Sequence, residues 1–142
     1  MKLKDIMTTD VLVVSPESNV VEAARLMERH GFGSVPVCDG GKILGIVTDR
    51  DLCLRVVGGG LNPNNCKVSE VMNGPIVWCY DDTEVDEATR LMETRQIRRL
   101  VVVDRDKKLV GVVALGDVAT RANERIAGEA LEKISEPAHP MH

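Results

Sequence analysis

The chain contains one pattern of residues twice. The pattern runs from Met7 to Asp51 and returns from Met72 to Asp117, at an offset of 65 residues (Met7 to Met72) that becomes 66 (Asp51 to Asp117) after one inserted residue. An internal repeat constrains the fold more than any single motif, because each copy must be one supersecondary unit and neighbouring copies bury a common core. A duplicated unit also predicts a pseudo-twofold cleft between its copies. The identical positions include Met7, Val20, Glu22, Ala23, Arg25, Leu26, Met27, Glu28, Val37, Asp39, Gly45, Val47 and Asp51, which correspond to Met72, Val85, Glu87, Ala88, Arg90, Leu91, Met92, Glu93, Val102, Asp104, Gly111, Val113 and Asp117.

The repeat predicts one module rather than two independent domains. One copy of about 60 residues would be only marginally stable alone, whereas two copies that share a core escape this limit. A run of three glycines followed by Asn62-Pro63-Asn64-Asn65 breaks the pattern and is typical of a linker. The predicted organisation is a first repeat at residues 1–57, a linker at 58–66, a second repeat at 67–122, and a C-terminal helix extension and tail at 123–142.

Each copy is predicted to fold as strand, helix, strand, strand, helix, which makes the fold class α+β. Short apolar runs bounded by turn residues predict the strands, and apolar positions spaced three and four apart predict the first helices. Turns are expected at residues 39–42 and 104–107. The last helix of the second copy is expected to run on through residue 127 or 131. The predicted strands are residues 11–14, 34–38 and 43–48 in the first copy and 76–80, 100–103 and 109–114 in the second.

The composition argues against a nucleic-acid or membrane-surface binder. Lys and Arg number 18 and Asp and Glu number 22, so the net charge is −4 and there is no basic surplus. Phe32, Trp78 and Tyr80 are the three aromatic residues, too few for a platform that stacks single-stranded bases. No run reaches the roughly 18 apolar residues of a membrane helix. A cytoplasmic location is therefore expected.

No catalytic or metal-binding motif appears in the sequence, so no catalytic residue, metal or required cofactor is predicted. The four cysteines, Cys38, Cys53, Cys66 and Cys79, form no Cys-x-x-Cys pair. A disulfide that involves Cys38 or Cys79 remains open. An enzyme that uses a reactive thiol also stays an alternative, because thiol reactivity depends on a lowered pKa that spacing does not reveal.

The segment from Gly45 to Asp51 is an apolar strand that ends in Thr48 and opens a helix. One interpretation is a capping box, in which the Thr48 hydroxyl and the Asp51 carboxylate each accept a bond from the other's backbone amide. The other is a ligand site, since a helix N-terminus offers amides to anions and a carboxylate can accept the two hydroxyls of a ribose. The second copy has Ala114 in place of Thr48 but keeps Asp117. If the aspartate served only the capping box, its presence beside Ala114, which has no hydroxyl group, would be harder to explain.

Arg98 and Arg99 precede the second strand of the second copy, where the first copy has Gly33 and Ser34. The pair is either a solvated charge cluster at a helix end or a phosphate-binding pair, because guanidinium groups form strong charged hydrogen bonds with phosphate. Since the copies differ here, the two clefts are predicted to be unequal.

The duplicated unit resembles a pair of CBS domains, also called a Bateman module, over about residues 1–122. The resemblance implies two repeats, each with a three-stranded sheet and two helices, about a pseudo-twofold axis. It also implies clefts that hold AMP, ADP, ATP or S-adenosylmethionine, and a flat homodimer. The residues that carry the resemblance are Asp5-Ile6-Met7, Glu70-Val71-Met72, Glu22-Ala23-Ala24, Glu87-Ala88-Thr89, Ser34-Val35-Pro36-Val37, and the Gly-led segments that end in Asp51 and Asp117.

Carried over by position, the resemblance implies one competent nucleotide site and one weaker cleft. In the competent site Asp51 holds the ribose, Thr48 lies beside the ribose or the phosphate, and Arg98 and Arg99 reach the phosphate. The base pocket of that site is formed by Thr9, Asp10, Val11, Phe32, Gly33, Ser34, Pro36 and Ile46. The weaker cleft contains Gly74, Pro75, Ile76, Ile97, Val112, Ala114 and Asp117.

The resulting prediction is a non-catalytic module that senses an adenine nucleotide and signals to a regulated protein or through its homodimer. Two alternatives stay open. The chain is a structural or interaction protein with empty clefts, or its ligand is S-adenosylmethionine.

Overall fold

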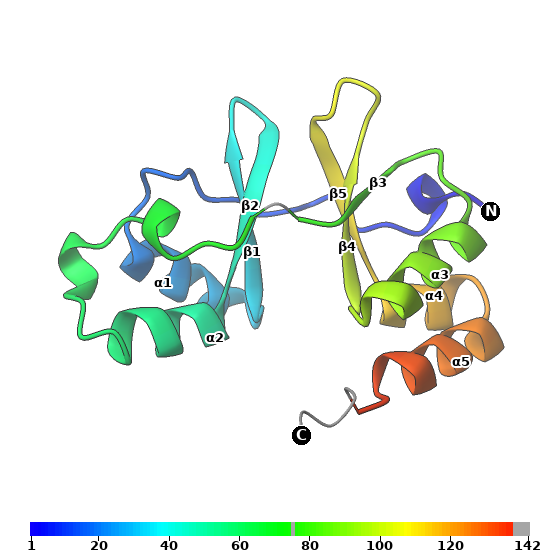
Figure 1. Ribbon diagram of the computed structural model, residues 1–142. Coiled ribbons are helices and arrows are strands. Elements are labelled where there is room, and N and C mark those ends of the chain that lie inside the picture. The colour runs from blue at the N-terminus through cyan, green and yellow to red at the C-terminus, as the bar shows by residue number, and fades with distance from the viewer. Residues whose placement is uncertain (75, 138–142) are drawn as a thin grey trace. The chain divides into compact units, whose positions relative to one another are not determined.

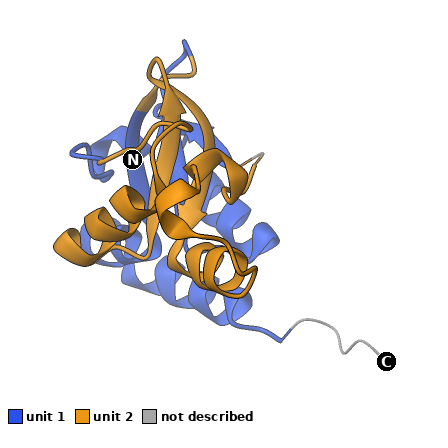
Figure 2. Cartoon of the chain, turned by 90° about the vertical axis from the view of Figure 1, so that its left-hand side faces the viewer, with its two compact units in different colours: residues 1–11, 77–106, 110–142 blue, residues 12–76, 107–109 orange. Residues whose placement is uncertain are grey.

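A computed structural model of the chain describes residues 1–74 and 76–137 (Figure 1). The chain forms two compact units, which Figure 2 shows in separate colours. Unit 1 comprises residues 1–11, 77–106 and 110–142, and unit 2 comprises residues 12–76 and 107–109. Each unit combines strands with helices, so the predicted α+β class is confirmed.

Unit 2 is built on an antiparallel hairpin. Strands β1 (Ser34–Asp39) and β2 (Lys42–Thr48) pair from Ser34 opposite Thr48 to Asp39 opposite Lys42. The predicted turn lies between them, where Gly40 and Gly41 both adopt positive φ, as a tight hairpin turn requires. Helix α1 (Val20–His30) precedes the hairpin. Helix α2 (Asp49–Asp51) follows it and continues as a π-helix at Leu52–Val57.

Unit 1 contains the corresponding elements of the second copy and one more helix. Strands β3 (Trp78–Tyr80), β4 (Arg99–Val103) and β5 (Leu109–Ala114) form a sheet in that order, with β3 parallel to β4. Helix α3 (Val85–Arg95) lies between β3 and β4 in the chain, and α4 (Leu115–Arg121) follows β5. Helix α5 (Glu124–Ile134) packs against both α3 and α4 and buries Ala127, Ala130 and Ile134.

The leading segment of each copy packs on elements of the other copy. Lys2 and Thr8 form bridges with Glu84 and Val112, and at the matching positions Lys67 and Asn73 form bridges with Asn19 and Ile46. The apolar side chains of these segments are fully buried where they pack: Leu3 and Ile6 in the core of unit 1, and Val68 and Val71 in the core of unit 2. The compact units are therefore not the two sequence copies, and the repeat boundaries drawn from the sequence stay predictions.

The predicted strand at residues 11–14 is wrong except at its last position. Val14 forms a parallel bridge with Val37, at the same place in the repeat as Cys79 opposite Val102 in the β3–β4 pair. Leu12 and Val13 are exposed, so the apolar run is not the buried strand that its composition indicates. Its counterpart is likewise shorter than the predicted 76–80.

The predicted run of the closing helix past Asp117 is also interrupted. Helix α4 ends at Arg121, and α5 starts afresh after Asn123, whose side chain accepts hydrogen bonds from the amides of Arg125 and Ile126. An asparagine that satisfies free amides in this way starts a new helix rather than continuing the previous one. The second helix then extends beyond residue 131 to Ile134.

Candidate functional site

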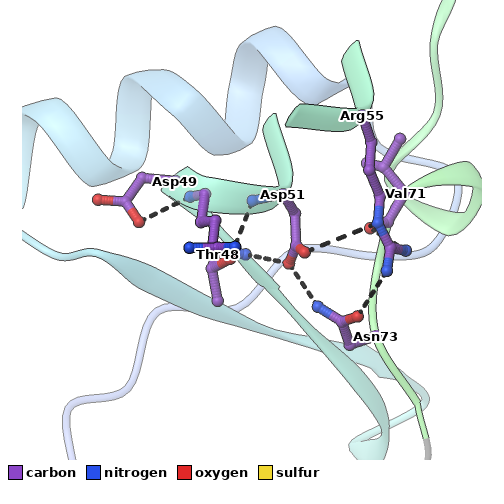
Figure 3. Close-up of polar contacts among 7 residues, drawn as sticks. Thr48, Asp49, Asp51, Arg55, Val71 and Asn73 are labelled. Carbon is purple, nitrogen blue, oxygen red and sulfur yellow. Dashed lines mark hydrogen bonds and ion pairs between the residues drawn. The ribbon is translucent and has the colours of Figure 1, made fainter. Parts of the chain in front are cut away.

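The predicted capping box at the end of β2 is present (Figure 3). Thr48 has an extended backbone, and its amide donates to Asp51 Oδ2 at 2.9 Å. In return the Asp51 amide donates to Thr48 Oγ1 at 3.1 Å. These two reciprocal bonds satisfy amides that a helix start leaves open, so the structural interpretation of the Thr48–Asp51 pattern is correct.

Two residues that the sequence did not single out hold the Asp51 carboxylate. Asn73 donates from Nδ2 to Asp51 Oδ2 at 2.6 Å, and Arg55 Nη2 donates to Asn73 Oδ1 at 3.0 Å (Figure 3). Arg55 also donates from Nη1 to the carbonyl oxygen of Val71 at 3.2 Å. The network ties the corner between β2 and α2 to residues 71–73. A signal existed for Arg55, because Arg121 stands at its counterpart position, four residues after Asp117.

The two oxygens of Asp51 differ in their surroundings. Oδ2 accepts from both Thr48 and Asn73, whereas Oδ1 faces only Arg55 Nε, at 3.9 Å, beyond hydrogen-bonding distance. Asp51 is 7% exposed. No buried side-chain oxygen in the described part of the chain lacks a hydrogen-bond partner, so Oδ1 keeps contact with solvent. A carboxylate oxygen of this kind is available to accept a hydroxyl from a ligand.

The matching corner in unit 1 keeps only half of this arrangement. Asp117 Oδ2 accepts from the Ala114 amide at 2.8 Å, but the Ala114 methyl group has no oxygen to return the bond. Arg121 donates to the Ile6 carbonyl at 3.2 Å, as Arg55 does to Val71. The retained half-box explains why an aspartate persists beside alanine. Persistence of Asp117 is therefore no argument for ribose binding, contrary to the sequence interpretation.

Exchanging the residues at the two N-cap positions should change stability in opposite directions. We expect Thr48→Ala to lower the free energy of unfolding by about 1 kcal/mol, because the Asp51 amide loses its acceptor. Ala114→Thr should raise it by about 0.5–1 kcal/mol, since it completes a box whose other half exists. Urea denaturation followed by circular dichroism measures both. Shifts of opposite sign support these roles of the two N-cap positions, and a loss of stability in Ala114→Thr contradicts them.

The structure gathers six of the predicted base-pocket and ribose residues at one corner of unit 2. The Gly33 carbonyl accepts from the Asp49 amide at 3.0 Å, which fixes the start of β1 against the start of α2. Ser34 pairs with Thr48, and Pro36 pairs with Ile46, in the β1–β2 register. The residues at this corner are Gly33, Ser34, Pro36, Ile46, Thr48 and Asp51.

Of the remaining residues predicted for this site, Phe32 alone belongs to unit 2. Phe32 is 40% exposed, and its ring stacks on His30 with centroids 5.8 Å apart. Thr9, Asp10, Val11, Arg98 and Arg99 belong to unit 1, so their contribution to a site at Asp51 stays a prediction.

The residues predicted for the weaker cleft are divided in the same way. Ile97, Val112, Ala114 and Asp117 belong to unit 1, Gly74 and Ile76 belong to unit 2, and Pro75 lies outside the described residues. Arg98 occupies the place of Gly33, because its carbonyl accepts from the Leu115 amide at 2.9 Å. Within unit 1, Arg98 and Arg99 line a pocket of about 530 Å³ together with residues of α4 and α5.

Three of the four cysteines lie in surroundings that disfavour a reactive thiol. All four are unpaired, and Cys38, Cys66 and Cys79 are buried. Burial raises the pKa of each of these three thiols, which disfavours the reactive thiolate. The described residues hold no group of three or more His, Cys, Asp or Glu side chains placed to bind a metal ion. None of the helices in the described ranges is long and apolar enough to cross a bilayer.

Comparison with known proteins gives one consistent family. The family model described as "CBS domain" matches residues 3–58 and again residues 68–124. The CBS domain-containing protein YhcV of Bacillus subtilis is 43% identical over 134 residues, which are 94% of each chain.

Two solved structures of similar fold contain adenosine compounds. The structure of CBSX2 in complex with AMP has a TM-score of 0.76 at 29% identity and is matched over 87% of this chain and 97% of that one. The CBS domain pair of protein MJ0100, in complex with 5′-methylthioadenosine and S-adenosyl-L-methionine, has a TM-score of 0.72 at 25% identity, over 84% and 97%.

Proposed function

Because the chain belongs to the CBS domain family, we propose that it is a regulatory module that binds an adenosine-containing ligand through the Asp51 carboxylate. Two structurally similar CBS-domain proteins support the ligand class, since one holds AMP and the other holds 5′-methylthioadenosine and S-adenosyl-L-methionine. An adenosine is common to all three compounds. The proposal has no catalytic step.

The observation that carries the proposal for this chain is the state of Asp51. Its carboxylate is fixed in position by Thr48 and Asn73, while Oδ1 accepts no hydrogen bond within the protein and keeps some contact with solvent beside Arg55 Nε at 3.9 Å. A fixed acceptor loses little conformational freedom when it binds a hydroxyl, so its hydrogen bond to a ribose is more favourable than that of a mobile side chain.

We further propose that the ligand is AMP, ADP or ATP, with Arg98 and Arg99 as the phosphate-binding residues. Charged hydrogen bonds from guanidinium to phosphate are about twice as strong as neutral ones. Ligand binding would favour one arrangement of the two units over others, and a partner protein or the second subunit of a homodimer would respond to that arrangement. S-adenosylmethionine is the second candidate, favoured by the MJ0100 complex, and it would not use a phosphate-binding pair.

Calorimetric titration of the unmodified protein with AMP, ADP, ATP and S-adenosylmethionine tests the ligand class. We expect at least one of them to bind with a dissociation constant below about 1 mM, which corresponds to about 4 kcal/mol. Tightest binding by a nucleotide supports the phosphate role of Arg98 and Arg99, and tightest binding by S-adenosylmethionine argues against it. If all four fail to bind, the chain is a structural CBS module and the proposal is wrong.

A further inference from the structure

Asn73 occupies the oxygen of Asp51 that a ribose would need for two-point binding. Asp51 Oδ2 already accepts two hydrogen bonds, from the Thr48 amide at 2.9 Å and from Asn73 Nδ2 at 2.6 Å (Figure 3). A carboxylate oxygen offers about two lone-pair positions, so Oδ2 is saturated. Oδ1 accepts no hydrogen bond within the protein and has only the Arg55 Nε ion pair at 3.9 Å. A cis-diol that binds one hydroxyl to each oxygen therefore cannot do so while the Asn73 bond remains.

The orientation of the Asn73 amide is fixed by its other neighbour. Arg55 Nη2 lies 3.0 Å from Asn73 Oδ1, and a guanidinium group has donors but no acceptor. The oxygen of the amide must therefore face Arg55 and its NH₂ group must face Asp51. Arg55 is itself anchored by the Val71 carbonyl at 3.2 Å. Asn73 thus cannot turn its amide around without losing both bonds.

The backbone of Asn73 is held independently of its side chain. Its amide and carbonyl pair with Ile46 of β2 at 2.8 and 2.9 Å. In unit 1 the counterpart Thr8 pairs with Val112 through the same two backbone bonds. The side chain at this position can therefore change without loss of the strand pairing, and threonine is compatible with the backbone there.

We propose that Asn73 is a specificity-determining latch, which competes with the ligand for Asp51 Oδ2. Its hydrogen bond to Oδ2 breaks when both ribose hydroxyls bind. The inference rests on the proposed function, since it assigns a regulator to the same site. While the latch is closed, Asp51 accepts one hydroxyl through Oδ1. Binding of the second hydroxyl opens the latch and releases the Asn73 side chain, and with it the contact from Arg55. Binding of an intact ribose is in this way coupled to residues 71–73, whereas binding of a deoxyribose is not.

The variant Asn73→Thr, which places the residue of the other repeat at this position, tests the latch. We expect the affinity for AMP to rise about three- to tenfold, because the ligand no longer has to displace the Asn73 hydrogen bond and one net hydrogen bond contributes about that factor. The affinity for 2′-deoxy-AMP should change by less than about twofold, because one hydroxyl is accepted by Oδ1 with or without the latch. The ratio of the two affinities is a measure that a purely structural role of Asn73 would leave unchanged.

The control is Thr8→Asn, the reciprocal change, which should leave AMP binding as it is in the unmodified protein. Arg55→Met tests the latch in a second way, because without Arg55 the Asn73 amide can turn away from Asp51. This variant should also raise the ratio of the affinity for AMP to that for 2′-deoxy-AMP. If AMP binds but this ratio is the same in all variants, the latch is wrong and the proposed function stands. If AMP and 2′-deoxy-AMP fail to bind to any of the proteins, the latch is wrong; the proposed function fails as well only if ADP, ATP and S-adenosylmethionine also do not bind.

Discussion

Asp51→Ala is expected to weaken binding of the adenosine ligand by about 100-fold or more. The carboxylate is the proposed acceptor of two ribose hydroxyls, and each hydrogen bond to a charged group contributes about 1.5–3 kcal/mol. Asp117→Ala, the matched change in the other repeat, should leave the affinity within about threefold, an effect of less than 1 kcal/mol. Calorimetric titration of both variants with the ligand that binds the unmodified protein most tightly measures the difference.

The loss of Asp51 also removes an acceptor that Thr48 and Asn73 use, so folding must be checked in the same samples. Leaving buried donors without partners costs about 1–3 kcal/mol, which lowers stability but should keep the far-ultraviolet circular dichroism spectrum unchanged at 25 °C. Asp51→Asn serves if the alanine variant unfolds, because an amide oxygen can still accept from Thr48. Equal losses of affinity in the Asp51 and Asp117 variants would contradict the asymmetry of the two repeats.

Gly45→Ala is expected to destabilise the protein by about 2–4 kcal/mol, the sum of overpacking and strained backbone hydrogen bonds. A methyl group at Gly45 would overlap the carbonyl oxygen of Asn73, which is backbone and bonded to the Ile46 amide at 2.9 Å. To make room, residues 71–73 must move away from β2. The free energy of unfolding from urea denaturation, monitored by circular dichroism, measures the effect.

Gly128→Ala is the control for the glycine prediction. Gly128 lies in α5, and an added methyl group there would meet no atom within 4 Å. Alanine is about 1 kcal/mol better than glycine in a helix interior, so this variant should gain up to that amount. If Gly45→Ala is as stable as the unmodified protein, the prediction that residues 71–73 require glycine at position 45 is wrong.

The same close approach explains why glycine recurs at Gly111. A methyl group there would crowd the Thr8 carbonyl oxygen at 2.9 Å and the Met7 side chain. The sequence shows that both copies have glycine at this position, but it does not show why. The reason depends on which segment pairs with β2 and β5, and these partners come from the opposite sequence copy. The pattern of residues within one copy does not show that its leading segment pairs with a strand of the other copy.

Most of the local structure could be predicted because it depends on neighbouring residues. The two hairpin strands, the helix that starts at Val20 and the capping box of Thr48 and Asp51 each follow from patterns a few residues long. Residues 11–14 were mispredicted because an apolar run does not show whether a partner strand lies alongside. The break between α4 and α5 depends on one side chain, that of Asn123, and the apolar pattern runs through it.

The candidate site was predicted in part for a related reason. Asp51 and Thr48 could be found as a pair three residues apart, and Gly33 was carried over from the family resemblance. Asn73 could not, because it lies 22 residues from Asp51 and differs from its counterpart Thr8. The comparison of repeats favours residues that are the same in both copies. A residue that acts in one copy only is found when the structure brings it to the site.

The role of Asp51 as the ribose-binding residue can be tested by a crystal structure of the protein grown with AMP, or with whichever of the four ligands binds most tightly. We expect ribose hydroxyls within about 2.5–3.0 Å of the Asp51 carboxylate, the range for such hydrogen bonds, and the Asn73 amide displaced from Oδ2. A ligand whose ribose contacts Asp117 alone, with the Asp51–Asn73 bond intact, would contradict it.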